Sequence, residues 1–538
     1  MRSAIDWFIT RKMWMGSLVV ILVFVFYFPI TEQHTQSFKF VDEDEYIVVA
    51  SLMNKGKKLY TDISTNHQPV TYIASQVIQK TAKVEPPNVF MLIKRHREAV
   101  FFWSVCWSLL LFFRFGWKVI PGVFVFEAIK YFVLGNEFVA ESLVSYPMIY
   151  LGVSTYELLR NKKPYKDHLF FGLTSVLSVL FLLPLAIPVL VATLLRFVKT
   201  GKKMIKGFVL GGLLALLIVF AHISPVDYFR ETIVNNYLYA LPAVSEIQNS
   251  GDLIKVILFM PRSLFNGTNL LSWWARFFSI SIITFFLISF FKGKRTHKVL
   301  SAGLMIMLIT LNLRVLEVGT YFYAGFHLLP WLAVASVMAY AFLYDFLVKI
   351  PAKFRWFYVI ILGLLSGILL MNRNSPILAR RDTATEHYVQ FAPVATASQI
   401  INLFKSEKDT LIVLPNETLI NWITNLNTAD RQVTYYDWQY QVPENRLGFE
   451  AMISGNLPDF IVFNDDRSGY SDAVVKIVKE KFLLLYAYSQ NTGGFVETYV
   501  RKDKLEVVDK EAWVSYLELP ITQSQEAISW YDENVKNN

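Results

Sequence analysis

The sequence predicts a multi-pass α-helical membrane protein with about 11 transmembrane helices, followed by a C-terminal soluble α/β domain. Of its 538 residues, 54% are hydrophobic and only 18% are charged. A soluble domain averages about 45–50% apolar and about 25% charged residues. Long apolar runs recur through residues 1–373, whereas residues 374–538 alternate short strand-like and helix-like patterns.

The predicted spans are apolar runs close to the ~20 residues that a helix needs to cross a bilayer. They cover 13–30, 98–113, 118–134, 142–158, 168–182, 184–198, 205–222, 270–291, 298–312, 321–345 and 355–371. No small-residue cleavage site follows the first run, so we expect an uncleaved span rather than a signal peptide. The run 118–134 departs most from the pattern because it holds Glu127 and Lys130.

The short loops at one end of the predicted spans are rich in lysine and arginine, which indicates that this end is cytoplasmic. Residues 31–97, 135–141, 223–269 and 313–320 are then expected on the outer side. With an odd number of spans, the N-terminus is cytoplasmic and the C-terminal domain is extracytoplasmic. We therefore expect a plasma-membrane protein with membrane lipids as its neighbours.

Charge is distributed unevenly along the chain. Residues 374–538 hold 15 lysines and arginines against 23 aspartates and glutamates, a net charge of −8. Because the whole chain has a net charge of +9, residues 1–373 carry +17. The positive-inside bias explains this excess, so the basic balance is no reason to expect nucleic-acid binding. The single cysteine, Cys106, excludes a disulfide within the chain.

The C-terminal part reads as a small α/β domain. Its buried-strand patterns are TLIVLP, DFIVFND and FLLLYAYSQ, with helical patterns near 396–405, 417–425 and 472–481. The predicted domains are therefore 1–373, with 31–97 as the first extracytoplasmic loop, and 374–538. The C-terminal part has neither the Cys/His spacing of a metal site nor a Gly-rich phosphate loop.

Two short helical patterns occupy the first outer loop. In the first, Tyr46, Val49, Ala50 and Met53 follow Asp42 on one helical face, and Gly56 can end the helix. The second pattern has an apolar stripe of Val70, Ile73, Ala74, Val77 and Ile78. Both are too short to span, so we expect them to lie at the outer membrane interface.

Four consecutive carboxylates open the first of these helices: Asp42, Glu43, Asp44 and Glu45. Acidic residues stabilise the first turn of a helix, so one alternative is a solvated helix start. That alternative remains open for Asp44 and Glu45. A run of four acids beside a membrane favours a functional role for at least one.

This loop resembles the first outer loop of GT-C fold glycosyltransferases, in particular the protein O-mannosyltransferase and lipid A aminoarabinose transferase group. The shared pattern is DExxYxxxAxxM, then a Gly, and then a Lys or His two residues before a Pro. The matching residues are Asp42, Glu43, Tyr46, Ala50, Met53, Gly56, His67, Pro69 and Tyr72. The resemblance is close over this loop, loose over the other spans, and does not extend to the C-terminal part.

The resemblance implies an enzyme that transfers a sugar from a polyprenyl-phosphate-linked donor to a glycan, lipid or protein acceptor at the extracytoplasmic face. It also implies that the transfer inverts the anomeric centre of the sugar. It implies that Asp42 is the general base and Glu43 its orienting partner. The residues alone leave Asp44 open as a competing base. Glu141, just before the fourth span, is also implied as catalytic, contacting hydroxyl groups or a metal.

Further residues are expected to bind substrate: Asp44, His67, Tyr72, Arg95, Arg97, Glu137, Tyr323 and His327. His67 is expected near the sugar phosphate, and the outer basic cluster KRHRE suits phosphate capture by arginine. Lipid headgroups are the alternative partner of that cluster, and an aromatic belt is the alternative for the late tyrosines. A helix-start carboxylate is the alternative for Glu137 and Glu141. The clustered acids permit a divalent metal ion without requiring one.

Two other classes of protein fit parts of this pattern. A transporter or lipid flippase would also have about eleven spans, but such proteins tend to show paired halves with Gly- and Pro-broken spans. That pairing is not evident, and the acids lie at span ends rather than mid-span. A membrane-anchored assembly protein would work through its C-terminal part, where no motif nominates a site.

Overall fold

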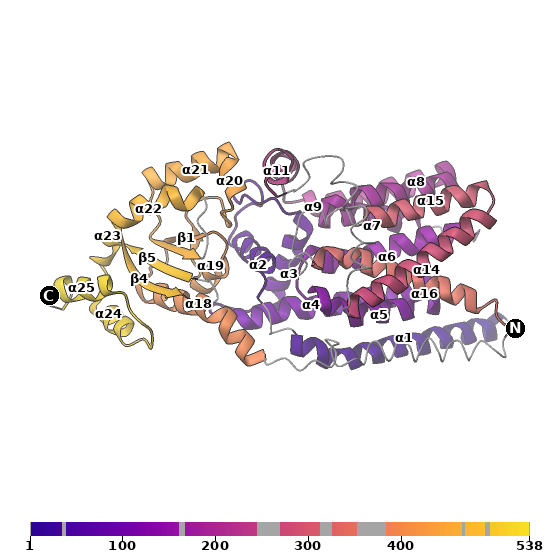
Figure 1. Cartoon of the computed structure of the whole chain (residues 1–538), viewed down its shortest axis with the longest axis horizontal. Coiled ribbons are helices and arrows are strands. Elements are labelled where there is room, and N and C mark those ends of the chain that lie inside the picture. Colours follow the sequence, from indigo (N-terminus) through magenta and orange to yellow (C-terminus); the bar gives the residue numbers. More distant parts are fainter. Residues whose placement is uncertain are drawn as a thin grey trace. The chain divides into compact units, whose positions relative to one another are not determined.

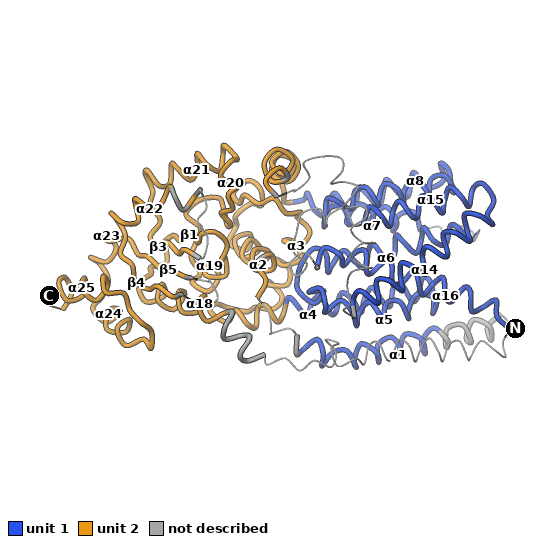
Figure 2. Tube along the Cα trace, in the orientation of Figure 1, with its two compact units in different colours: residues 1–35, 96–221, 244–381 blue, residues 36–95, 222–243, 382–538 orange. Residues whose placement is uncertain are grey.

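The structure, a computed structural model, describes residues 2–34, 39–160, 167–244, 270–311, 325–351, 383–464, 469–489 and 495–536. The chain divides into two compact units (Figure 2). Unit 1 comprises Met1–Thr35, His96–Ala221 and Val244–Arg381, and unit 2 comprises Gln36–Arg95, His222–Ala243 and Asp382–Asn538. Unit 2 therefore combines the first outer loop with the C-terminal residues. The domain boundary expected after residue 373 stays a prediction.

Unit 1 consists of helices in its described residues (Figure 1). They are α1 (Arg2–His34), α4 (Val89–Phe115, which begins in unit 2), α5 (Ile120–Ile129), α6 (Ala140–Leu159), α7 (His168–Phe181), α8 (Ala186–Thr200), α9 (Ile205–Phe220), α14 (Leu270–Lys292), α15 (Arg295–Thr310) and α16 (Leu329–Leu347). Short 3₁₀ turns join several of them: η1 (Gly116–Lys118), η2 (Lys130–Val133), η3 (Leu183–Leu185), η4 (Gly201–Met204) and η8 (Gly325–Leu328).

Five stretches of the described residues are long and apolar enough to cross a membrane. They are Met13–Glu32, Val89–Lys118, Leu183–Phe220, Leu271–Lys292 and Phe326–Leu347. This confirms a mostly helical, multi-pass membrane protein. The predicted span 118–134 is divided between the 10-residue helix α5 and the turn η2. The predicted span 355–371 lies outside the described residues, and the exact number of spans stays a prediction.

Small residues let the helices of unit 1 approach closely. A Cβ atom on Gly172 of α7 would lie 2.2 Å from the carbonyl oxygen of Phe208 on α9. A Cβ atom on Gly211 of α9 would lie 2.0 Å from the carbonyl oxygen of Leu169. Close backbone packing of this kind stabilises helix pairs in lipid, where apolar side chains gain little by leaving the solvent.

The C-terminal residues of unit 2 form a five-stranded sheet in the order β2-β1-β3-β5-β4. The strands are β1 (Thr410–Leu414), β2 (Asn427–Thr428), β3 (Phe460–Asn464), β4 (Phe482–Ser489) and β5 (Phe495–Arg501). β1 is parallel to both β2 and β3, and β5 is antiparallel to β3 and β4. The three strand patterns recognised in the sequence coincide with β1, β3 and β4.

The helices that precede, separate and follow these strands along the chain are α18 (Thr383–Phe404), α19 (Leu419–Thr424), α20 (Asp437–Gln441), α21 (Pro443–Ser454), α22 (Gly469–Lys481), α23 (Lys502–Leu505), α24 (Lys510–Leu517) and α25 (Gln525–Asn534). One hydrophobic core joins the sheet to α21 and α22 through Ile412, Ile461, Phe449 and Tyr470, each at most 1% exposed.

The two helices predicted in the first outer loop are α2 (Val41–Asn54) and α3 (Pro69–Ala82). Gly56, at a φ of +94°, follows the end of α2, and Pro69 opens α3 at a position where its missing N–H costs nothing. On α3 the polar face is inside, with Thr71 and Ser75 buried, and Val77 is 55% exposed. An outward apolar stripe is typical of a helix at a membrane interface. α2, by contrast, is buried along most of its length.

Candidate functional site

The acids at the start of α2 have different surroundings. Asp42 is half-buried, Glu43 and Asp44 are 0% exposed, and Glu45 is 3% exposed. The alternative that Asp44 and Glu45 are simply solvated is therefore wrong. Buried carboxylates need compensating partners, because desolvation disfavours their charged form.

Asp44 is paired with Lys39, which precedes α2. Lys39 Nζ lies 3.4 Å from Asp44 Oδ2 and also forms an ion pair with Glu417, in the segment after β1. Burial lowers the pKa of Lys39, but the carboxylates of Glu417 and Asp44 outweigh it and hold the pKa above its ordinary value. Burial raises the pKa of Asp44 well above its usual range, against the effect of Lys39. Asp44 thus anchors Lys39, whereas Asp42 is half-buried.

Glu45 holds the segment that carries His67. Its Oε1 accepts hydrogen bonds from Thr65 Oγ1 at 2.8 Å and from the Tyr72 hydroxyl at 2.7 Å. Its Oε2 lies 3.9 Å from His67 Nε2, and the Tyr46 hydroxyl lies 2.8 Å from His67 Nδ1. The His67 side chain is 19% exposed. Tyr72, expected to bind substrate, is fully buried with its hydroxyl on Glu45.

The segment before His67 is also held by residues from two distant parts of unit 2. Arg431 donates to the Tyr60 carbonyl at 2.9 Å and forms an ion pair with Glu231, while Ser64 N donates to the Arg431 carbonyl at 2.7 Å. Glu231 belongs to the π-helical turn η5 (Arg230–Val234), which follows α10 (Pro225–Phe229). The Tyr228 hydroxyl donates to Gln68 Oε1 at 2.8 Å. The position of His67 is therefore fixed by tertiary contacts on both sides.

Unit 1 holds a second group of predicted site residues. Glu141, in the first turn of α6, has its Oε1 2.8 Å from His327 Nδ1 of η8. Arg97 of α4 forms an ion pair with Glu137. All four side chains are buried, with Glu141 2% and Arg97 1% exposed. The structure thus brings these predicted residues together as two pairs.

One alternative for this group is wrong. Glu137 is not a helix-start carboxylate, because α6 begins at Ala140 and the residue before it, Val139, is extended. The basic cluster is also divided, since Arg95 is exposed whereas Arg97 is buried. Tyr323 lies outside the described residues.

Glu127 and Lys130, which are close to this group in sequence, form a buried ion pair and were not among the predicted site residues. Lys130 Nζ lies 2.7 Å from Glu127 Oε2 and donates to the Tyr146 hydroxyl at 3.2 Å. Lys130 and Glu127 are each 2% exposed. The spacing of three residues inside an apolar run was the available signal, because it places both charges on one helical face.

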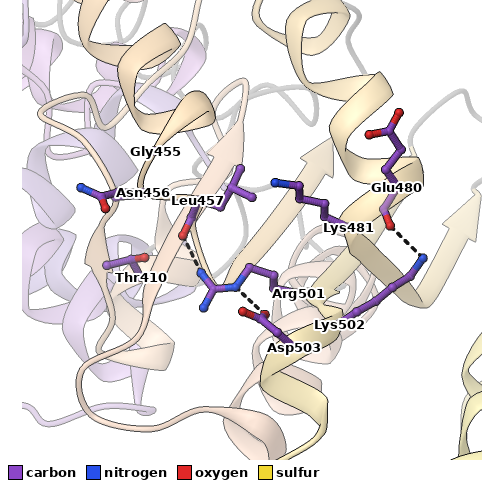
Figure 3. Close-up of a pocket in the computed structure, with 10 residues that line it drawn as sticks. Thr410, Gly455, Asn456, Leu457, Glu480, Lys481, Arg501, Lys502 and Asp503 are labelled. Atoms are coloured by element: carbon purple, nitrogen blue, oxygen red, sulfur yellow. Dashed lines mark hydrogen bonds and ion pairs between the residues drawn. The ribbon is translucent and has the colours of Figure 1, made fainter.

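One hollow in the C-terminal sheet has a volume of about 780 Å³ (Figure 3). It lies at the amino edge of the parallel strands, where β1 starts at Thr410. Two of its cations are already engaged: Arg501 donates to the Leu457 carbonyl at 2.7 Å and to Asp503 Oδ1 at 2.6 Å, and Lys502 donates to the Glu480 carbonyl at 3.1 Å. Glu417 lies beyond the opposite end of β1, so this hollow is separate from the acids of α2.

The described residues contain no group of three or more His, Cys, Asp or Glu side chains arranged to hold a metal ion. The carboxylates of α2 instead find protein partners, as Asp44 does in Lys39 and Glu45 does in Thr65 and Tyr72.

Comparison with known proteins gives a structural match alone. No protein-family model matches the sequence, and no curated protein matches it. A solved structure of ArnT from Cupriavidus metallidurans bound to undecaprenyl phosphate aligns with a TM-score of 0.51, covering 91% of this chain and 98% of its own, at 13% identity. The chain has a GT-C fold. The apo structure of the same ArnT aligns with a TM-score of 0.49 over 92% of this chain and 98% of its own, also at 13% identity.

The alignment covers nearly the whole of each chain. The fold class suspected from nine residues of the first outer loop is thereby confirmed. At 13% identity the alignment establishes the fold alone and assigns no role to a residue.

Proposed function

We propose that this protein is an integral-membrane glycosyltransferase that takes a hexose or pentose from a polyprenyl-phosphate-linked donor. The observation that carries the proposal is the GT-C fold shared with an ArnT that binds undecaprenyl phosphate. The acids of α2 support it, because Asp42 is the half-buried member of an otherwise buried set. The acceptor is a hydroxyl group of a glycan, lipid or protein, and the reaction takes place at the extracytoplasmic face of the plasma membrane.

In the proposed reaction Asp42 accepts the proton of the acceptor hydroxyl while its oxygen attacks the anomeric carbon. The bond from that carbon to the phosphate oxygen breaks, its electrons stay on the phosphate, and the anomeric centre is inverted. His67, tethered by Tyr46 and Glu45, is the proposed group beside the phosphate. Glu141, oriented by His327, is proposed to bind hydroxyl groups of the sugar or acceptor. The N-terminus is proposed to be cytoplasmic.

Mass spectrometry of envelope glycans and glycolipids from cells with and without the gene tests this function. We expect one class of glycosylated product to vanish with the gene and to return with the wild-type copy. Unchanged glycans together with slower movement of a lipid across the bilayer would support a transporter or flippase instead.

A further inference from the structure

The sheet of unit 2 has a topological switch point at the carboxyl end of β1. The chain passes from β1 to β2 on one side and then to β3 on the other, and both neighbours are parallel to β1. In open α/β sheets, ligands bind outside the carboxyl ends of the strands at such a point. β1 ends at Leu414, so residues 415–417 form this edge.

A second segment is attached to the same edge. Tyr435 N donates to the Pro415 carbonyl at 2.8 Å, which brings Tyr436 beside Asn416. Asn416 and Tyr436 are therefore neighbours at this edge. Tyr436 precedes α20, and its backbone N–H is capped by Gln439 Oε1 at 2.8 Å, so its backbone position is fixed.

The acids of α2 face this edge. The ion pair of Lys39 with Glu417 joins α2 to it, and α19 packs on α2. Burial raises the pKa of the Tyr436 phenol above its ordinary value, and the negative charges of Asp42 and Glu45 raise it further. Asp42 is the carboxylate that acts most strongly on this phenol. The phenol therefore stays protonated and can donate a hydrogen bond.

Asn416, Tyr436 and Asp42 are each half-buried, whereas Tyr435 and Thr418 beside them are buried. These three side chains are thus less enclosed than their immediate neighbours. An amide and a phenol donate and accept hydrogen bonds, as sugar hydroxyls require. The carboxylates of Asp42 and Glu417 disfavour a further negative charge there.

We propose that Asn416 and Tyr436 are acceptor-binding residues, and that the acceptor presents an uncharged, polyhydroxylated group to Asp42. The C-terminal domain then selects the acceptor rather than merely accompanying the membrane part. This inference rests on the proposed function, and it adds both the domain that binds the acceptor and the chemical class of the acceptor group.

Transfer kinetics of the purified full chain test the inference, with undecaprenyl-phosphate-linked sugar as donor and a dilution series of envelope extract as acceptor. Tyr436→Phe and Asn416→Ser should each remove one hydrogen bond to the acceptor. The concentration of extract at half-maximal transfer should therefore rise about fivefold in each variant. The maximal rate and the affinity for undecaprenyl phosphate, followed by intrinsic fluorescence, should stay within about twofold. Tyr440→Phe, a hydroxyl loss on α20 at a residue bonded to Glu450, is the matched control and should change neither value.

Three results would overturn the inference while the proposed function stands. The first is wild-type kinetics for Tyr436→Phe, Asn416→Ser and their double variant. The second is a lower affinity for undecaprenyl phosphate in those variants. The third is a product in which the sugar is attached to a phosphate group of the acceptor. Absence of transfer by the wild-type protein would instead reject the proposed function, and the inference with it. Melting temperatures identify any variant that fails to fold, and the other substitution then carries the test.

Discussion

Nδ1 of His327 lies 2.8 Å from Oε1 of Glu141, and the two side chains are 7% and 2% exposed. The residues are 186 positions apart in the chain, so the contact exists only in the folded protein. An imidazole at this distance fixes the direction in which the carboxylate presents its second oxygen. Glu141 is therefore held in one orientation at the start of α6.

Replacement of Glu141 by Gln should lower transfer by roughly 100-fold with little loss of stability, because the amide keeps the shape and a bond to His327 but loses the charge. His327→Ala should lower transfer less, since it releases the orientation but leaves the carboxylate. Glu85→Gln, an exposed change, is the control. Wild-type transfer by Glu141→Gln would show that Glu141 is only a helix-start carboxylate.

Arg97→Ala should destabilise the protein by about 3 kcal/mol, because it leaves the buried Glu137 without its cation. Arg95→Ala, at an exposed position on the same helix, should change stability by less than about 0.5 kcal/mol. Melting temperatures in detergent measure both effects. Equal melting temperatures for the two variants would contradict the ion pair.

Lys39→Met should also cost about 3 kcal/mol, since Asp44 and Glu417 lose their shared cation. Lys39→Arg should retain most of the stability. Without the cation the folded-state pKa of Asp44 rises further, so its folded form takes up a proton more readily than the unfolded chain does. The deficit should therefore be larger at pH 8 than at pH 5, and a deficit independent of pH would contradict this arrangement.

Asp430→Asn should stabilise the protein at neutral pH. Burial raises the pKa of Asp430 from 3.8 to about 6, although Tyr435 and Gln432 hydrogen-bond to it. A raised folded-state pKa means that the folded protein binds more protons between pH 4 and 6, so wild-type stability falls as the pH rises through that window. The Asn variant, which keeps both bonds, should gain on the order of 1 kcal/mol at pH 7.

The gain of the Asp430→Asn variant should disappear toward pH 4, where the wild-type carboxyl is already protonated in the folded state. Melting temperatures of the full chain at pH 4, 5, 6 and 7 measure this trend. A gain that is the same at every pH would mean that the substitution acts through packing rather than through charge.

Local signals were enough to locate much of this fold. The 3.6-residue periodicity and Gly56 predicted α2, and Pro69 marked the start of α3. Three apolar runs predicted β1, β3 and β4. These features depend on neighbours in the chain, which a sequence displays directly. The alternative of a helix start at Glu137 was wrong, and the extended Val139 carries no turn or cap residue that would mark the boundary.

The partners of the site residues could not be predicted in the same way. Lys39 lies next to α2 and was overlooked, but Glu417 is 378 positions from it, and no periodicity connects the two. Burial also reversed an expectation, since Asp44 and Glu45 were open to a solvated interpretation until the fold enclosed them. Which acid of a run stays accessible is decided by tertiary packing, and here it is Asp42.

The central claim is tested most directly by sugar transfer from an undecaprenyl-phosphate-linked donor in membranes that contain the wild-type protein, Asp42→Asn, or the control Asp62→Asn, an exposed residue of the same loop. We predict labelled product with the wild type and the control, and a loss of at least about 100-fold with Asp42→Asn at equal protein levels. Wild-type transfer by Asp42→Asn would contradict the role of Asp42, and absence of any gene-dependent transfer would contradict the proposed function.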